Sequence, residues 1–166
     1  MTLSFNKLLT TKEEFESLDY TNPYNTVAAF IHLICSYEEK NSSSFYEKLQ
    51  LLMVDYQPIS EIMKQNIKDI MLQNHKYTYI GKSYFIGSSP ENDYTPTEPY
   101  QLDIIENEYS SIEEGYKRLF VKSSGADSLR PITVRLAKDG KYYIWSDSFM
   151  GLLSDIRPLE SSNPWV

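Results

Sequence analysis

The sequence predicts an α+β fold, in which N-terminal helices pack on one face of a twisted antiparallel sheet. Apolar residues recur at three- and four-residue spacing up to about residue 74, and at every second position from Tyr77 onward. The clearest hairpin turn, Asp139-Gly140, lies in the second of these parts. We therefore expect a single domain over residues 1–166, with a helical part at 11–74 and a sheet part at 77–158.

The first two helices are predicted by their N-terminal signals. Thr11-Lys12-Glu13-Glu14 is a capping box, in which the Thr hydroxyl and the Glu carboxylate bond free backbone N–H groups, so a helix is expected at 11–18. Asn22-Pro23 combines a favoured N-cap with proline at the first helical position. This second helix is expected to end near Glu39, and His32 lies beside its apolar stripe, which consists of Val27, Phe30, Ile31, Ile34 and Cys35.

Two more helices are expected before residue 74. Ser44-Phe45-Tyr46-Glu47 has the form of a second capping box, and the apolar face that follows continues to about Asp55. Pro58 ends that region, and Ser60 is the expected N-cap of a fourth helix, whose apolar side consists of Met63, Ile67, Ile70 and Met71.

Short runs of alternating polarity predict the strands. They lie at 77–79, 84–86, 101–106, 118–122, 132–136 and 142–145, and a helical turn is expected at 149–153. Residues 88–100 and 123–128 are expected to be polar loops, the first because its three prolines cannot donate to a ladder. At the level of fold alone, helices over a wrapped sheet are similar to cystatin-like and NTF2-like arrangements.

The charge excludes some classes of partner. The net charge is −7 and the pI is about 4.9, which argues against binding to a nucleic-acid backbone or to an anionic membrane. Tyrosine is frequent, with 14 residues, and its ring and hydroxyl suit either a half-buried sheet face or a contact surface for another protein.

Cysteine use and hydropathy predict a cytoplasmic protein that holds no cofactor or metal. Cys35 is the single cysteine, so an internal disulfide and a cysteine zinc site are excluded, and we expect it to be a buried small hydrophobic residue. Residues 1–20 lack the basic and apolar runs of a signal peptide, and no window approaches the ~18 apolar residues of a membrane span. The oligomeric state is not predicted.

Two long motifs lie in the loops. Residues 83–96 read SYFIGSSPENDYTP, and residues 124–135 read SGADSLRPITVR. Together with Asn22-Pro23-Tyr24 and the tail of Ile156-Arg157-Pro158 and Asn163-Pro164-Trp165, they resemble an uncharacterised bacterial family found in Firmicutes. Leu129 stands where the family tends to have proline, and Asn163 where it tends to have an acidic residue. The resemblance implies a Gram-positive, cytoplasmic origin and brings no established activity.

The candidate binding residues are polar and aromatic, because the sequence contains no GxGxxG, GxxxxGK[ST], GxSxG or HExxH signature. They are Tyr84, Glu91, Asn92, Asp127, Arg130, Trp145 and Arg157. If the two motif loops meet at one end of the sheet, an Asp–Arg pair beside aromatic walls forms a small cleft. In the structural alternative, Asp127 caps its own turn and pairs with Arg130, while Arg157 stacks on Trp145.

Two functions from different classes follow from these features. The first is a non-catalytic protein-interaction domain that uses the Tyr-rich sheet face or the 88–100 loop, in one version as an immunity-like protein that blocks a basic partner. The alternative is a small-molecule-binding domain or enzyme, with a cleft formed by the 88–100 and 123–131 loops.

Overall fold

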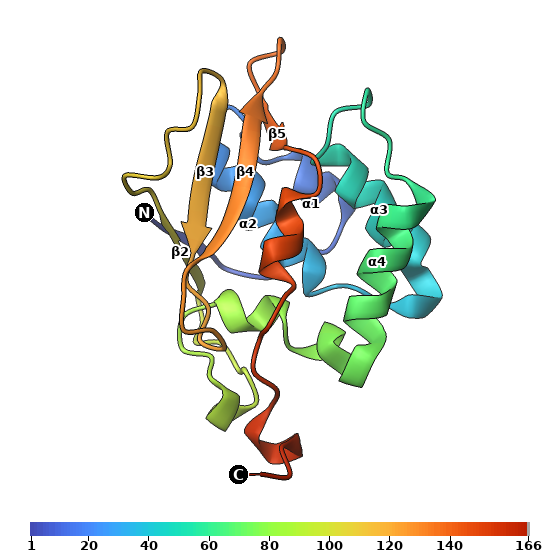
Figure 1. Ribbon diagram of the computed structural model, residues 1–166, viewed down its shortest axis with the longest axis vertical. Helices are drawn as coiled ribbons and strands as arrows, with labels where there is room; N and C mark the ends of the chain where they lie inside the picture. The colour runs from blue at the N-terminus through green and yellow to red at the C-terminus, as the bar shows by residue number, and fades with distance from the viewer. Residues whose placement is uncertain (166) are drawn as a thin grey trace.

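An antiparallel sheet organises the part of the chain that the computed structural model describes, residues 1–165. Its five strands are hydrogen-bonded in the order of the chain. They are β1 (Thr2–Phe5), β2 (Tyr100–Ile105), β3 (Tyr116–Val121), β4 (Arg130–Leu136) and β5 (Tyr142–Ile144). Figure 1 shows the helices behind and beside this sheet. The prediction of an α+β fold, with helices packed on a twisted antiparallel sheet, is confirmed.

Helix α2 (Pro23–Ile34) is the centre of the core. It begins where expected, because the Asn22 side chain accepts a hydrogen bond from the Tyr24 N–H at 3.0 Å. Every residue from Thr26 to Ile34 is buried, since α2 contacts strands β2 to β5 and also helix α3 (Ser42–Leu51). A helix in this position needs apolar residues around most of its circumference, which this segment provides.

The end of α2 corrects three predictions. The helix stops at Ile34 rather than near Glu39, because the N–H groups of Cys35 and Ser36 bond to carbonyls three residues back and tighten the last turn. His32 is fully buried within the core, not beside the apolar stripe. Cys35 is only partly buried, although its thiol lies directly against Gly81.

The other helices follow their N-terminal signals with one exception. Helix α1 (Lys12–Glu16) has the predicted capping box, and Ser60 caps α4 (Glu61–Leu72) by accepting a hydrogen bond from the Met63 N–H. Helix α3 begins two residues before the predicted cap, and its N-cap residue makes no side-chain hydrogen bond. Ser44 instead accepts a hydrogen bond from the Lys48 ammonium within the helix, so the spacing of a capping box was misleading there.

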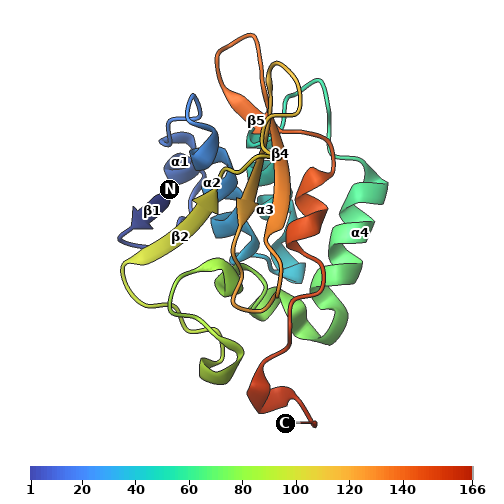
Figure 2. The same cartoon turned by 60° about the vertical axis from the view of Figure 1, so that its left-hand side comes forward.

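The strands predicted before residue 87 are wrong. Residues 73–84 form two 3-10 helices, η2 (Gln73–Thr78) and η3 (Gly81–Tyr84), and only the single bridge between Phe85 and Leu102 pairs this region with the sheet. Residues 79–81 and 83–85 are buried almost continuously, so the apparent alternation was not a strand period. Strand β1 was missed because it is short and only half-buried; Figure 2 shows it beside β2.

The hairpin between β4 and β5 closes the sheet. The predicted Asp139-Gly140 turn is present, with a φ of +82° at Gly140 that suits a glycine. On the side away from β4, Tyr142 N–H donates to the Tyr20 carbonyl and Ile144 N–H to the Leu52 carbonyl, both at 2.8 Å. The backbone N–H groups on the outer edge of β5 therefore have hydrogen-bond partners, one in the connection between α1 and α2 and one at the C-terminal end of α3.

Candidate functional site

Segments at two separate ends of the molecule carry most of the predicted site residues. The 3-10 helix of residues 90–92, the connection between β3 and β4 and the C-terminal segment lie toward the lower end in Figure 1, and β5 lies toward the upper end. Asn92, Asp127 and Arg157 belong to the first group, whereas Trp145 directly follows β5. The structure therefore does not bring Trp145 to the predicted cleft.

At the lower end, Arg157 and Asp127 form an ion pair that holds the C-terminal segment against the connection between β3 and β4. The Arg157 guanidinium donates to Asp127 Oδ1 at 2.8 Å and to the Ser124 carbonyl at 3.2 Å. The predicted pair between Asp127 and Arg130 does not form, because Arg130 Nη2 donates to the Asp155 carbonyl at 3.1 Å. The expected stacking of Arg157 on Trp145 is also wrong, since Arg157 is held at the opposite end.

Asn92 and Glu91 are neighbours with different roles. Asn92 Oδ1 accepts hydrogen bonds from the N–H groups of Ser89 and Thr95, and its Nδ2 donates to the Gly87 carbonyl at 2.8 Å. It therefore holds together the 3-10 helix η4 (Pro90–Asn92) and the turn that follows it. The Glu91 side chain is exposed and makes no hydrogen bond or ion pair within residues 1–165.

Buried hydroxyl groups fill the space where the two motif loops meet. The Ser123 hydroxyl donates to the Ser83 hydroxyl at 2.8 Å, and the hydroxyl oxygens of Ser88 and Ser124 lie 3.2 Å apart. Tyr94 stacks on Tyr79 with ring centroids 5.4 Å apart and donates to the Arg157 carbonyl. These contacts are internal, so the loops are fastened to each other rather than held apart as the walls of a cleft.

Tyr84 belongs to the core rather than to a surface. Its side chain is 2% exposed, and its hydroxyl donates to the Leu152 carbonyl at 2.5 Å. Burial raises the pKa of this phenol well above its usual value.

At the upper end, an arginine lies over two adjoining aromatic rings on the sheet face that the helices leave open. Ile132 and Val134 of β4 point into the core, so Arg135 points outward. Its guanidinium carbon lies 4.7 Å from the ring centroids of both Tyr116 and Trp145. The register places Tyr116 opposite Arg135, and the two rings meet edge to face at 5.3 Å.

A hollow of about 520 Å³ adjoins this stack. It separates the hairpin from the connection between α3 and α4, and its lining includes Tyr56, Leu136, Tyr143 and Trp145. Tyr56 is 93% exposed and Leu136 is 42% exposed. We call the surface formed by the following residues the hairpin patch: Tyr56, Tyr116, Arg135, Leu136, Tyr143 and Trp145.

The connection that carries Tyr56 is held in place by Gln50 of α3. The Gln50 amide donates to the carbonyls of Val54 and Gln57 and accepts from the Ile59 N–H at 3.1 Å. These bonds fix both ends of the turn, so Tyr56 projects from a defined position although its ring makes few contacts.

The polar groups near the patch are mostly engaged. Tyr143 donates to Asp139 Oδ2 at 2.6 Å, and partial burial with this carboxylate raises the pKa of the phenol to about 12. The same hydrogen bond lowers the pKa of Asp139. By contrast, no acceptor or carboxylate within residues 1–165 meets the Arg135 guanidinium or the Lys138 ammonium group.

Of the hairpin patch, sequence reasoning identified only Trp145. The other residues come from three separate segments, and no local motif connects them. The signal that was available is the alternation across the hairpin, where Arg135 faces away from the core between Val134 and Leu136. Tyr56 lacked any signal, because the Gln50 hydrogen bonds that set the turn around it follow no recognised sequence pattern.

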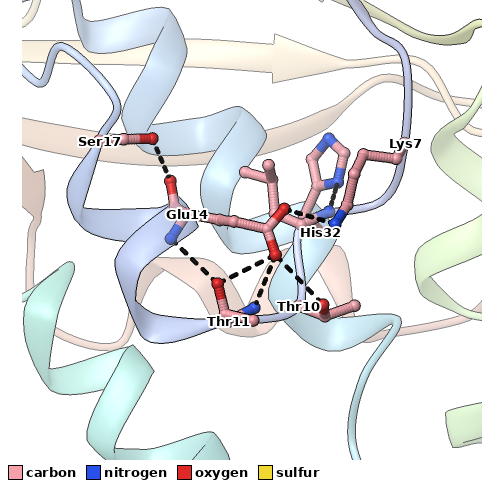
Figure 3. Close-up of polar contacts among 7 residues, drawn as sticks. Lys7, Thr10, Thr11, Glu14, Ser17 and His32 are labelled. Carbon is pink, nitrogen blue, oxygen red and sulfur yellow. Dashed lines mark hydrogen bonds and ion pairs between the residues drawn. The ribbon is translucent and has the colours of Figure 1, made fainter.

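Near the N-terminus, polar contacts tie the chain to the core helix. Figure 3 shows the Glu14 carboxylate between Lys7, Thr10 and Thr11, with His32 close by. The hydrogen bond from Lys7 is the main cause that lowers the pKa of Glu14 to about 2. His32 Nδ1 accepts a hydrogen bond from the Leu9 N–H at 3.0 Å, and burial lowers the pKa of this imidazole to about 4.

Comparison with known protein families matches residues 7–160 to the family described as Domain of unknown function (DUF6935). The chain belongs to this family. The match includes both motif loops and the whole hairpin patch. Comparisons with curated proteins and with solved structures give no significant match.

No helix within residues 1–165 has both the length and the apolar composition needed to cross a membrane. The same residues contain no group of three His, Cys, Asp or Glu side chains that are placed to hold a metal ion.

Proposed function

We propose that this chain is a non-catalytic protein-interaction domain, which docks a partner protein on the hairpin patch. The observation that carries the proposal is the Arg135 guanidinium that lies over the adjoining rings of Tyr116 and Trp145 beside an apolar hollow. Trp, Tyr and Arg are the residue types that most often dominate the energy of protein interfaces. Because the stack orders Arg135 before binding, less side-chain entropy is lost on association.

The exposure of the surrounding side chains supports the same proposal. Tyr56 and Leu136 leave large apolar surfaces in water next to the hollow. Contiguous exposed apolar surface with a polar rim is a feature of interaction sites on soluble proteins. The sheet face therefore supports the contact surface that the tyrosine-rich composition predicted, although tyrosine is joined there by tryptophan and arginine.

The immunity-like version of this proposal, in which the partner is basic, draws its support from the net charge of −7. The cations at the hairpin patch do not add to that support. We also propose a bacterial (Firmicutes) origin, a cytoplasmic location and a partner that is not a nucleic acid. The sequence motifs support the origin and the location, and the charge supports the class of partner.

The small-molecule alternative has less support. Its residues Asp127, Arg130 and Arg157 bond to each other or to backbone carbonyls, and the hydroxyl groups of the motif loops bond among themselves. The hollows nearest to the hairpin are lined by other residues.

A pull-down from the native host tests the proposed function. We expect the wild-type chain to recover a partner, and Trp145→Ala and Tyr56→Ala each to reduce the recovery by about tenfold or more. Tyr109→Ala is the matched control, because Tyr109 is a 64% exposed tyrosine outside the hairpin patch. Equal recovery by all variants, or no partner above background, would refute the proposal.

A further inference from the structure

We infer that the segment docked on the hairpin patch is an extended acidic peptide of the partner, in which a carboxylate lies close to a large apolar side chain. This inference rests on the proposed function and names the chemistry of the partner. Charge complementarity at the patch and the apolar lining of the adjoining hollow support it.

The guanidinium of Arg135 is oriented but not used. The rings of Tyr116 and Trp145 lie together on one side of the guanidinium carbon, 4.7 Å from it and 5.3 Å from each other between centroids. The other side of the group is open, and Arg135 is exposed. No acceptor within residues 1–165 meets its N–H donors. A carboxylate matches a guanidinium edge with two parallel hydrogen bonds, which makes it the ligand that best fits this arrangement.

The charges around the hollow favour an anion. Arg135 and Lys138 are the charged residues that line it, and no acidic residue is among them. In a chain with a net charge of −7, this is a local reversal of sign. Two carboxylates adjoin the lining residues. Asp139 is bonded to the Tyr143 hydroxyl and the Lys141 N–H, and Asp55, between Val54 and Tyr56, is exposed and does not line the hollow.

The rest of the hollow suits an apolar side chain. Val54, Leu136, Ile144 and the ring of Trp145 give it apolar walls. A large apolar side chain that docks there removes its own surface and that of these walls from water.

The two parts of the site lie side by side. Arg135 and Trp145 belong both to the stack and to the lining of the hollow. A carboxylate on Arg135 therefore places its neighbouring side chain over the apolar walls. Polyanions are disfavoured as occupants, because two cations give little counterion release and the remaining surface is acidic.

Selection from a displayed library of random short peptides, with the full chain as target, tests the inference. We expect enrichment of peptides in which Asp or Glu lies near Trp, Phe or Leu. Calorimetry on an enriched peptide should give about tenfold weaker binding for Arg135→Gln. Arg135→Glu should instead prefer the same peptide with its acidic residue replaced by Lys.

Arg157→Gln is the control, because Arg157 is an exposed arginine paired with Asp127 at the other end of the molecule. It should bind the peptide as the wild type does, and thermal unfolding should show that each variant is folded. The inference is overturned if the enriched peptides lack acidic residues, if no peptide is enriched, or if Arg135→Gln binds unchanged.

The inference and the proposed function can fail separately. If Trp145→Ala and Tyr56→Ala abolish peptide binding while Arg135→Gln does not weaken it, the patch is a docking surface for a partner of different charge. If acidic peptides bind equally to the Trp145→Ala, Tyr56→Ala and Arg135→Gln variants, they dock elsewhere, and both statements are refuted.

Discussion

His32 is a neutral base enclosed in the core. Its Nδ1 accepts a hydrogen bond from Leu9, so the proton of the neutral ring sits on Nε2, which has no partner within residues 1–165. The rings of Phe5 and Phe85 lie edge-on at 4.4 Å and 5.1 Å between centroids. Protonation would place a charge among these rings and would remove the acceptor of the Leu9 N–H, which is why the folded state resists it.

Stability should therefore fall as the pH falls through the ordinary titration range of histidine. The pKa of His32 is lowered from 6.5 to about 4 by burial, so between these values the unfolded chain binds a proton that the folded chain does not. Denaturant unfolding should show a loss of about 1 kcal/mol between about pH 7.5 and about pH 5.5 from this group.

The variant His32→Gln should lack that part of the pH dependence, and His75→Gln, which changes the exposed histidine, should keep it. Glu14 affects stability at lower pH. Its pKa is lowered from 4.5 to about 2, so the stability that its carboxylate contributes is lost only as the pH falls below 4.5. An unchanged slope in His32→Gln would contradict the assignment.

Among the structural elements, the turn around η4 in the 88–99 loop is held by the side-chain amide of Asn92. Asn92 supplies both an acceptor and a donor that close the turn around η4. Because the loop has no ladder of its own, these bonds replace secondary structure. The Glu98–Pro99 peptide bond at its end is cis, and β2 begins directly after it.

Replacing Asn92 with alanine should loosen the loop and lower the free energy of unfolding by about 1–2 kcal/mol, since a cap and several backbone partners are lost. Hydrogen exchange of the Ser89 and Thr95 amides should become faster. Glu91→Ala is the control at the adjacent position, and it should leave both measurements unchanged. Equal exchange rates of these amides in the two variants would show that Asn92 does not hold the turn.

Elements were predictable from sequence where one local signal determines them. The caps at Thr11, Asn22 and Ser60 each satisfy a backbone group within a few residues, so the chain itself contains the information. Residues 73–86 were misread because their conformation depends on distant contacts. Gly81, for example, lies against Cys35 with no room for a side chain.

Candidate residues show the same division. The sequence placed Asn92 and Asp127 in the two motif loops and Arg157 in the C-terminal tail, because proline, glycine and polar residues mark loops directly. Their partners were not predictable, because the sequence does not show whether Arg130 or Arg157 pairs with Asp127. The path of the C-terminal segment brings Arg157 to Asp127. The hairpin patch was largely missed, since its residues meet only after the sheet and helices have packed.

For the whole molecule, we propose that residues 1–166 form one cooperative unit. Helix α2 contacts four strands. The ring of Phe30 in α2 packs on the ring of Phe149 in the 3-10 helix η5 (Ser148–Leu152), with 5.1 Å between the ring centroids. The buried apolar residues of both parts belong to one cluster. Loss of a central contact should therefore destabilise the helical and the sheet part together.

The variant Phe30→Ala, with Trp165→Phe so that Trp145 alone reports on the sheet, should lose about 3–5 kcal/mol of unfolding free energy. Far-ultraviolet circular dichroism and Trp145 fluorescence should show transitions at the same denaturant concentration. The Trp165→Phe chain with an intact Phe30 is the reference. Two separated transitions would mean that the parts unfold independently.

The outer side of β5 has a consequence for how another molecule can be recognised. The carbonyl groups of Tyr20 and Leu52 already occupy its amides, so a visiting chain cannot join the sheet there as an extra strand. Such joining tolerates many sequences, because it uses main-chain groups that every residue has. A partner that binds at this end is therefore recognised through its side chains. Such a site can distinguish one binding sequence from another.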